Sequence, residues 1–516
     1  MARSKQLSDE LWMKIFSYFP LPTQCTTLSR VCKHWYNLTR DKQQLSDELW
    51  MKIFSYFSFP TQCKTLSRVC KHWYNLTRDK QLWREITFRD VDCMLSMKDF
   101  QMLLFHNNLS ITTSLSLVNQ PLFKDSMLDM LVNVNTNLTS LSLISCERIT
   151  DEGFMLISNF TKLKNLVITI NENISNESIS YITQNVTELE ELVLDECYRL
   201  TDEALLAISY LPKLWRLEIP NLKVSTATLA HMSQNLQYLS HLRMGSSIWA
   251  LTRDEIASLC FRNLSSIYFT SLGKDTDEVL ANLVGNNRNL KTIILKECKI
   301  TGEFIFHVTN LKELIMSVCN NLREKFYVHL QNEINVEDLH VTVTPYCSPR
   351  FSFSNVRRLT AVFPPFFKSV FSSNLHNYDF LRVENLHTLY LYTTKTQTIE
   401  QVCLEIILST CKNLIKLYIG GVYFSNSESL ELNENLSIRE LHAFLFRNMD
   451  ELVLFKLGRA LPNLCSAEMK YINRITKSMV KKFCMHCAYL MHLDIDGIER
   501  STLKEIWFRN SNVIFS

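Results

Sequence analysis

The chain has 516 residues, of which 46% are hydrophobic and 21% are charged, and its formal net charge is +3 at pH 7. A sequence of this length can bury a large core, and its small net charge gives no reason to expect nucleic acid or an anionic membrane as a partner. The apolar stretch 11–21 is interrupted by Lys14, and no stretch approaches a membrane-spanning length. We therefore expect a cytoplasmic or nuclear protein.

The first 81 residues contain the same segment twice. Residues 6–43 recur as residues 44–81, an offset of 38 positions. The copies differ only where Pro20, Leu21 and Thr26 are replaced by Ser58, Phe59 and Lys64. Only the second copy continues into the sequence Leu-Trp-Arg-Glu-Ile at 82–86, because the first copy runs straight into the second. The second copy is therefore complete and the first is truncated at its C-terminal end.

The second copy has the spacing of two amphipathic helices. Apolar residues recur every four positions from Leu45 to Phe57, which predicts a helix that starts at about Ser46 with two carboxylates in its first turn. A second helix is predicted after Pro60, where apolar residues recur at spacings of three and four up to Leu76. Fewer than fifty residues cannot bury both apolar faces, so we expect one face to meet a partner.

The rest of the chain has a period of about 25 residues. The first apolar residue of a short strand, here called the anchor, recurs in a pattern L-x-x-L-x-L, which predicts a solenoid of strand-and-helix repeats. The sixteen anchors are Leu115, Leu141, Leu166, Leu192, Leu217, Leu242, Ile267, Ile293, Leu314, Leu339, Leu359, Leu389, Leu417, Leu441, Ala467 and Leu493. Cysteines recur at fixed distances from anchors, as at Cys146 and Cys197, and Thr150 and Thr201 have the position of helix N-caps.

Strand residues that alternate with the anchors should face outward and line the concave side of the solenoid. Charged residues and tyrosine at these positions suit protein recognition, although any solvated strand face can have such a composition. The candidate substrate-binding residues are Glu191, Asp195, Arg216, Glu218, His241, Arg243, Tyr268, Lys296, Lys416 and Tyr418, and His492 and Asp494 share the pattern.

The complete second copy resembles an F-box. The matching segments are Leu-Ser-Asp-Glu-Leu (45–49), Ile-Phe-Ser-Tyr-Phe (53–57), Ser-Arg-Val-Cys-Lys-His-Trp (67–73) and Leu-Trp-Arg-Glu-Ile (82–86). Ser46 departs from the proline that is usual in the family. The later repeats resemble the cysteine-containing class of leucine-rich repeats. The resemblance implies an α/β fold with a truncated F-box copy at 1–43, a complete all-helical F-box at 44–88 and a horseshoe of about 16 repeats at 89–516.

This resemblance implies a function without catalysis. F-box proteins with leucine-rich repeats are substrate receptors of Skp/cullin/F-box ubiquitin ligases, in which the F-box binds the Skp adaptor and the repeats hold a protein substrate. The adaptor contacts carry over onto Leu45, Leu49, Ile53, Val69, Cys70, Trp73, Leu82 and Trp83. We hypothesise that the indoles of Trp73 and Trp83 are interface anchors, so that replacing both by alanine abolishes adaptor binding and leaves the repeats folded.

No sequence pattern points to an enzyme or a cofactor. The chain has only nine glycines and lacks a phosphate-binding glycine-rich loop, a His-Glu-x-x-His helix and a Gly-x-Ser-x-Gly turn. Most of the 16 cysteines fall in the duplicated segments or at repeat-core positions, so we interpret them as small buried hydrophobes. Cys484-Met485-His486-Cys487 has metal-like spacing but lacks a second pair of ligands nearby, which argues against zinc.

The repeat loses its rhythm between residues 340 and 375. Four of the eleven prolines lie there beside six phenylalanines, so loops are expected. One interpretation is an aromatic loop that grips a partner; the one we favour is a degenerate repeat whose phenylalanines fill the core.

Two other functions are compatible with the sequence. The chain could be an F-box scaffold that binds the adaptor without directing ubiquitination, or a leucine-rich repeat inhibitor or assembly protein whose N-terminal helices only cap the solenoid. Binding of cullin and RING subunits separates the first from a ligase receptor, and failure to bind the adaptor supports the second.

Overall fold

The computed structural model forms two compact units, Met1–Val224 and Ser225–Ser516. It describes residues 47–54, 67, 71–89, 95–105, 109–135, 137–222, 224–245, 260–273, 276–342, 355–363, 383–393, 398–472, 475–496 and 514–515. The first F-box copy and most of the irregular segment 340–375 therefore lie outside the described residues. Among those described, no helix has the length and apolarity needed to cross a bilayer.

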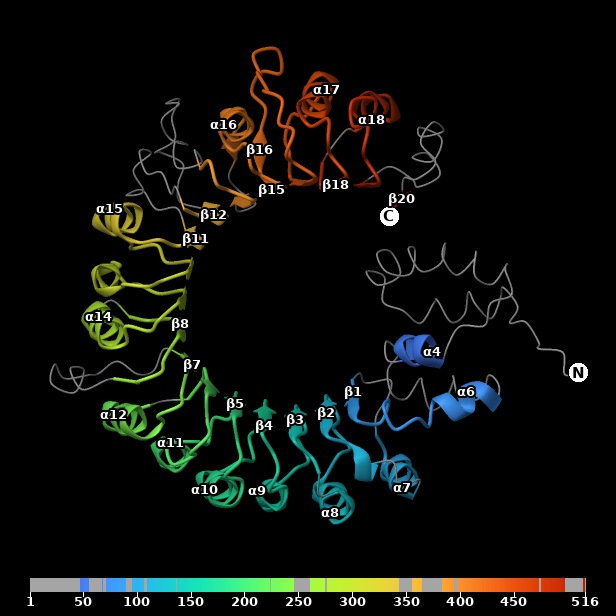
Figure 1. The fold of residues 1–516 in the computed structure, drawn as a ribbon, viewed down its shortest axis with the longest axis vertical. Coiled ribbons are helices and arrows are strands. Elements are labelled where there is room, and N and C mark those ends of the chain that lie inside the picture. The colour runs from blue at the N-terminus through green and yellow to red at the C-terminus, as the bar shows by residue number, and fades with distance from the viewer. Residues whose placement is uncertain are drawn as a thin grey trace, which may run out of the picture. The chain divides into compact units, whose positions relative to one another are not determined.

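The described part of the first unit consists of two short helices followed by a parallel sheet with a helix layer on one side (Figure 1). The short helices are α4 (Asp47–Phe54) and α6 (Lys71–Leu76). The strands are β1 (Glu85–Phe88), β2 (Ser114–Val118), β3 (Ser140–Ile144), β4 (Asn165–Thr169), β5 (Glu191–Asp195) and β6 (Arg216–Ile219). Between them lie α7 (Met97–Phe105), η4 (Leu109–Ile111), α8 (Asp125–Val134), α9 (Asp151–Met155), η5 (Leu156–Asn159), α10 (Asn176–Asn185) and α11 (Asp202–Ile208).

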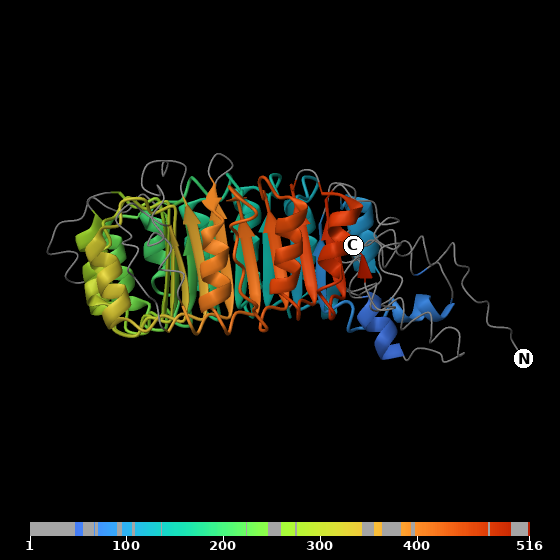
Figure 2. The same ribbon diagram turned by 90° about the horizontal axis from the view of Figure 1, so that it is seen from above.

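The second unit repeats the same alternation, and in Figure 2 its orange and red helices lie across one face of strands that run side by side. The strands are β7 (His241–Met244), β8 (Ser266–Thr270), β9 (Thr292–Lys296), β10 (Glu313–Ser317), β11 (Asp338–Thr342), β12 (Arg358–Phe363), β13 (Thr388–Thr393), β15 (Lys416–Gly420), β17 (Glu440–Phe444), β18 (Ser466–Lys470), β19 (His492–Ile495) and β20 (Ile514–Phe515). The helices are α12 (Thr226–Asn235), α14 (Asp277–Asn286), η7 (Glu303–His307), α15 (Glu324–Glu333), α16 (Val402–Thr410), α17 (Glu451–Ala460) and α18 (Lys477–Cys484). A small separate pair is formed by β14 (Ile399–Glu400) and β16 (Val422–Tyr423).

The strand register confirms the predicted repeat. In the first unit each anchor from Leu115 to Leu217 pairs with the anchor of the next strand, and in the second unit the same holds from Leu242 to Leu493. The sheet starts earlier than the predicted solenoid start at 89, because Ile86 of β1 pairs with Leu115. The fold is therefore an α/β solenoid of parallel strands, as the sequence predicted.

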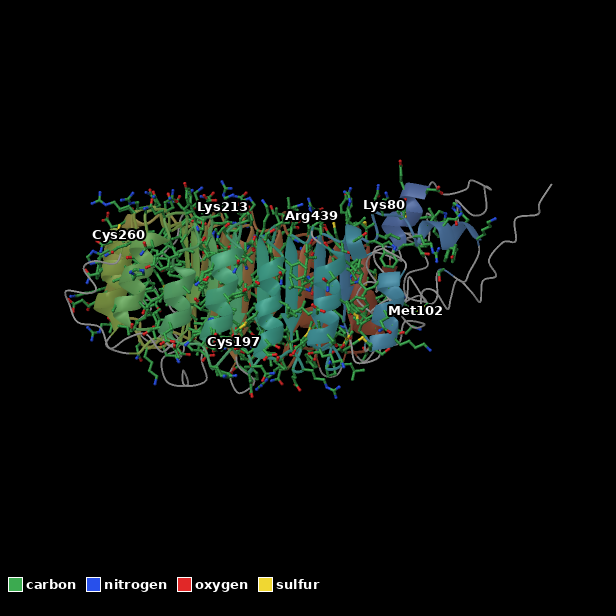
Figure 3. The ribbon with its side chains drawn as sticks, turned by 90° about the horizontal axis from the view of Figure 1, so that it is seen from below. Lys80, Met102, Cys197, Lys213, Cys260 and Arg439 are labelled. Atoms are coloured by element: carbon green, nitrogen blue, oxygen red, sulfur yellow. The ribbon has the colours of Figure 1, made fainter. Side chains whose placement is uncertain are left out.

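The anchors build the core of each unit. All sixteen are at most 2% exposed, and most strands alternate buried and partly exposed residues. Of the ten described cysteines, eight are buried, including Cys146 and Cys197. Burial raises the pKa of each of these two thiols to about 12, which keeps them protonated packing residues. Figure 3 shows Cys197 and the exposed Lys213 at opposite edges of the sheet of the first unit.

The helix layer of the first unit is tied together by polar side chains at helix starts. The predicted N-caps are confirmed: Thr150 accepts a hydrogen bond from the Gly153 amide, and Thr201 from the Glu203 amide. Asp125, the first residue of α8, also accepts hydrogen bonds from the Thr150 amide at 2.9 Å and the Thr150 hydroxyl at 2.6 Å. A carboxylate of one repeat thus fixes the helix start of the next.

Candidate protein-interaction surfaces

The two helices of the second F-box copy meet through aromatic rings. The ring of Trp73 on α6 lies 4.7 Å from Trp50 and 5.0 Å from Phe54, both on α4. Trp73 is 3% exposed and Phe54 is fully buried. These rings form the small core that a segment of this length can supply by itself.

The Leu-Trp-Arg-Glu-Ile segment joins this core to the sheet. The Trp83 indole is 4% exposed and donates a hydrogen bond to the Thr77 carbonyl at 2.9 Å. The Trp83 carbonyl accepts a hydrogen bond from the Thr112 hydroxyl at 2.8 Å, and the residues that follow enter strand β1. The segment that distinguishes the second copy from the first therefore continues directly into the sheet of the first unit.

The structure places the predicted adaptor contacts unevenly. Trp73, Leu82 and Trp83 are each at most 8% exposed in the chain by itself. Leu45, Val69 and Cys70 lie outside the described residues, as do the side chains of Leu49 and Ile53, whose backbone belongs to α4. The adaptor contact of all eight residues stays a prediction.

Exposed side chains on α4, on α6 and just after α6 make two polar contacts. The His72 imidazole lies 3.1 Å from the Asp47 carboxylate and links the two helices. Tyr74 is 40% exposed, and the Arg78 guanidinium lies 4.2 Å from the centre of its ring. An exposed ring covered by a cation is a feature that a protein partner can contact.

Four predicted substrate-binding residues gather on β5 and β6 of the first unit. The Arg216 guanidinium lies 2.5 Å from the Glu218 carboxylate and 3.7 Å from that of Glu191. Asp195 accepts a hydrogen bond from the Asn221 amide group at 2.5 Å. All four face outward from the sheet, as predicted, and their substrate-binding role stays a prediction.

Four more lie on β7, β8 and β9 of the second unit. The ring of Tyr268 is contacted by two cations, with Arg243 at 4.6 Å and Lys296 at 5.0 Å from its centre. His241 lies at the start of β7, where its Nδ1 is 2.8 Å from the Ser240 hydroxyl. These strands thus present a cationic cluster around one tyrosine.

The last two of the predicted substrate-binding residues are Lys416 and Tyr418 on β15. They belong to a larger cluster of aromatic and charged side chains. Tyr418 stacks between Tyr390 of β13 and His442 of β17, with ring centres 4.3 and 4.2 Å apart and interplanar angles of 16° and 9°. All three residues directly follow their anchors, and the strand register aligns them. Tyr390 and His442 were not predicted, although their positions match the pattern that selected Tyr418.

A second aromatic contact lies beside this stack and depends on a glycine. Tyr392 of β13 and Phe444 of β17 occupy aligned positions on either side of β15, and their rings stack at 5.2 Å and 22°. The intervening position on β15 is Gly420, where a Cβ atom would come within 2.2 Å of the Phe444 ring. We call Tyr390, Tyr392, Tyr418, His442 and Phe444 the aromatic surface.

Ion pairs border the aromatic surface. Lys416 pairs with Glu440 at 2.8 Å, and His442 Nδ1 lies 2.7 Å from the Glu468 carboxylate. Lys470 contacts the carboxylates of Asp494 and Asp496. These pairs hold four carboxylates, two lysines and one histidine, so acidic side chains outnumber basic ones at this border.

The Cys484-Met485-His486-Cys487 segment packs against its neighbours. Cys484 and Cys487 are buried, and burial raises the pKa of both thiols. The His486 ring contacts the edge of Phe455 at 4.9 Å. Among the residues that the structure describes, no group of three or more possible ligands is arranged to hold a metal ion.

Comparison with known families identifies the N-terminal segment. The F-box-like family model matches residues 9–46 and again residues 47–89. No curated protein matches the chain significantly.

Two solved structures are reported for the comparison of folds. The complex of Rad7 and Elc1 in yeast contains a chain with 12% identity and a TM-score of 0.38, covering 91% of this chain and 96% of the other. An internalin (inlF) from Listeria monocytogenes has 18% identity and a TM-score of 0.35, covering 76% of this chain and 89% of the other.

The strand register and the family match together define a class of architecture. It consists of an F-box-like N-terminal segment followed by a solenoid of parallel strands with leucine-type anchors. Within that class, the chain carries the F-box-like sequence twice, and the second copy leads directly into the sheet.

Proposed function

We propose that the chain is a substrate-recognition subunit of a Skp/cullin/F-box ubiquitin ligase. The second F-box copy binds the Skp adaptor, and through it the cullin and RING subunits, while the repeats hold a protein substrate for ubiquitination and proteasomal degradation. The observation that carries the proposal is the family match over residues 47–89, directly followed by a solenoid with outward-facing polar and aromatic residues.

In this proposal the chain contributes proximity and orientation. A ligase receptor holds its substrate near the transferring enzyme and needs no catalytic side chain of its own. The hydrogen bond from the Thr112 hydroxyl to the Trp83 carbonyl and the pairing of β1 with β2 tie the docking module to the sheet of the first unit. Such a connection restrains the module relative to the repeats that directly follow it.

The duplication supplies a matched control for the adaptor contact. Leu45 and Leu49 have identical counterparts in the first copy, Leu7 and Leu11. We expect Leu45→Ala/Leu49→Ala to abolish co-purification of the adaptor with the full chain, and Leu7→Ala/Leu11→Ala to leave it unchanged. Loss of binding in the second variant and retention in the first would contradict the assignment of the docking site to the second copy.

Because Trp73 and Trp83 are buried, a loss of adaptor binding in their alanine variants can result from unfolding as well as from a lost contact. Replacing a buried tryptophan by alanine costs about 3–5 kcal/mol, so Trp73→Ala/Trp83→Ala should unfold the docking module as well as abolish adaptor binding. This double variant is therefore paired with amide hydrogen exchange over residues 71–89. Retained protection with lost binding would show that the indoles contact the adaptor directly.

Reconstitution separates a ligase receptor from a scaffold. Purified chain, adaptor, cullin and RING subunit are mixed and separated by size-exclusion chromatography. A ligase receptor co-elutes with all three partners. A chain that carries the adaptor but never the cullin is a scaffold, and a chain that fails to bind the adaptor is a leucine-rich repeat binding protein of another kind.

A further inference from the structure

The aromatic surface of the second unit lies on the side of the strands that faces away from the core. The anchors Leu389, Leu417 and Leu441 are fully buried, whereas Tyr390, Tyr418 and His442, which directly follow them, are partly exposed. The sheet is therefore packed without these rings. The five rings together form one contiguous, partly exposed apolar cluster.

The solenoid backbone does not require aromatic residues at these positions. In the first unit the residues that directly follow the anchors of β2 and β3 are Ser116 and Ser142, in the same register. A serine and a tyrosine are thus compatible with the same strand geometry. The rings of β13, β15 and β17 need an explanation other than the fold.

Gly420 indicates that the contact between rings is a specific arrangement. Any side chain on β15 at this position would collide with Phe444 and separate it from Tyr392. Gly420 is the last residue of β15, and a glycine there adds backbone entropy to the unfolded chain and offers no side chain to pack. The close approach of the Tyr392 and Phe444 rings across β15 explains why a glycine occupies this position.

The charges around the rings restrict what can bind. Glu440, Glu468, Asp494 and Asp496 outnumber Lys416 and Lys470, so an anionic ligand would be repelled and a cationic one attracted. Aromatic rings add favourable contacts to arginine and lysine side chains through their π faces and to apolar side chains through their area. The excess of carboxylates and the aromatic rings therefore both favour a ligand that carries cationic and apolar side chains.

We infer that the aromatic surface binds an extended peptide segment of a protein partner that carries arginine or lysine next to aromatic or large aliphatic residues. The rings take the apolar side chains, and the carboxylates of Glu468 and Asp494 take the cationic group. This inference rests on the proposed function, because it names the class of substrate that the repeats of the receptor recognise. The cationic cluster around Tyr268 does not share this chemistry.

The test is a peptide selection against the purified full chain. A phage-displayed library of random twelve-residue peptides is selected on the wild-type chain and counter-selected on a Tyr390→Ala/Tyr418→Ala variant. Enriched sequences should combine arginine or lysine with neighbouring apolar residues. Enrichment of acidic sequences, or no enrichment over the variant, would overturn the inference.

Affinities of a selected, fluorescently labelled peptide then locate the site. We expect Tyr390→Ala/Tyr418→Ala to weaken binding at least about tenfold, since aromatic anchors dominate interfaces. Glu468→Gln should weaken binding about threefold and reduce its salt dependence, because one screened charge contact is lost. Gly420→Ala should also weaken binding by displacing Phe444. The matched control is Tyr238→Ala, a 65% exposed tyrosine of the second unit that belongs to neither the aromatic surface nor the candidate substrate-binding residues, which should leave the affinity unchanged.

Two further measurements keep the outcomes distinct. Circular dichroism and thermal unfolding of each variant establish that the sheet is intact, and the outward-facing Glu468→Gln variant provides a test if Gly420→Ala does not fold. Adaptor binding is measured on the same preparations. Peptide binding without adaptor binding would refute the ligase proposal and leave the peptide-binding role of the aromatic surface standing. Adaptor binding together with a peptide affinity that none of the variants changes would refute the peptide-binding role alone.

Discussion

The outward faces of the two units differ although their strands follow the same register. In the first unit, β2 and β3 carry serines on both sides of the anchor, among them Ser116 and Ser142. In the second unit, the positions aligned across β13, β15 and β17 carry Tyr390, Tyr418 and His442. The comparison teaches that the buried residues of each strand specify the sheet. The outward-facing residues between them are free to vary and can specify what the sheet binds.

The largest effect on stability is expected for a buried residue of β15, in comparison with the outward-facing residue next to it. Leu417 is fully buried and its neighbour Tyr418 faces outward. Leu417→Ala should reduce the free energy of unfolding of the second unit by about 2–5 kcal/mol, through lost burial and a residual cavity. Tyr418→Ala should change it by less than about 1 kcal/mol. Denaturant titrations of both variants check the difference, and equal losses would show that the stacked rings are part of the core.

A smaller effect is expected in the helix layer of the first unit. Asp125→Ala removes the acceptor of two hydrogen bonds from Thr150, and we expect a loss of about 2 kcal/mol in the free energy of unfolding. Asp129→Ala is the matched control, because Asp129 lies on the same helix with an exposed side chain. An equal effect of the two substitutions in denaturant titrations would mean that Asp125 does not couple the repeats.

Acid should weaken the second unit through its histidines. Burial lowers the pKa of His340 and of His492 below the usual value of about 6.5. As the pH falls below 6.5, the unfolded chain therefore takes up protons before the folded chain does, so stability is fully present above that pH and is lost below it. We expect His340→Phe to reduce the drop in unfolding midpoint between pH 7.5 and pH 5.5. An unchanged drop would exclude His340 as a source.

The smallest effect sharpens the comparison between the two faces. Ser142→Tyr places an aromatic residue on β3 at the position that Tyr418 occupies on β15. If the outward alternation is free to vary, the free energy of unfolding of the first unit should change by less than about 0.5 kcal/mol. A large loss in thermal or denaturant unfolding would show that the first unit requires small residues there.

The sheet could be predicted from the sequence because a single repeat of about 25 residues sets the positions of the anchors and of the strand residues beside them. Leu115 to Leu493 were assigned correctly, since each apolar anchor is selected by burial. Strand β1 was not predicted as the start of the sheet, because residues 85–88 also complete the F-box pattern. The tie between Asp125 and Thr150 joins residues 25 positions apart and follows from the packing of two helices rather than from either helix alone.

The interaction surfaces were less predictable than the sheet. The burial of Trp73 results from its packing against Trp50 and Phe54, which spacing along one helix does not reveal. The stack of Tyr390, Tyr418 and His442 could have been proposed, since all three directly follow anchors. The contact across Gly420 could not, because it depends on ring orientations on two strands that are not neighbours.

The central claim is that the chain docks through one F-box-like copy, although the family model matches both. Light scattering coupled to size-exclusion chromatography measures the mass of the complex between the full chain and an excess of the Skp adaptor. The account predicts one adaptor per chain for the wild type and for a chain lacking residues 1–43, and none for Leu45→Ala/Leu49→Ala. Two adaptors per wild-type chain, or one retained by the Leu45→Ala/Leu49→Ala variant, would contradict it.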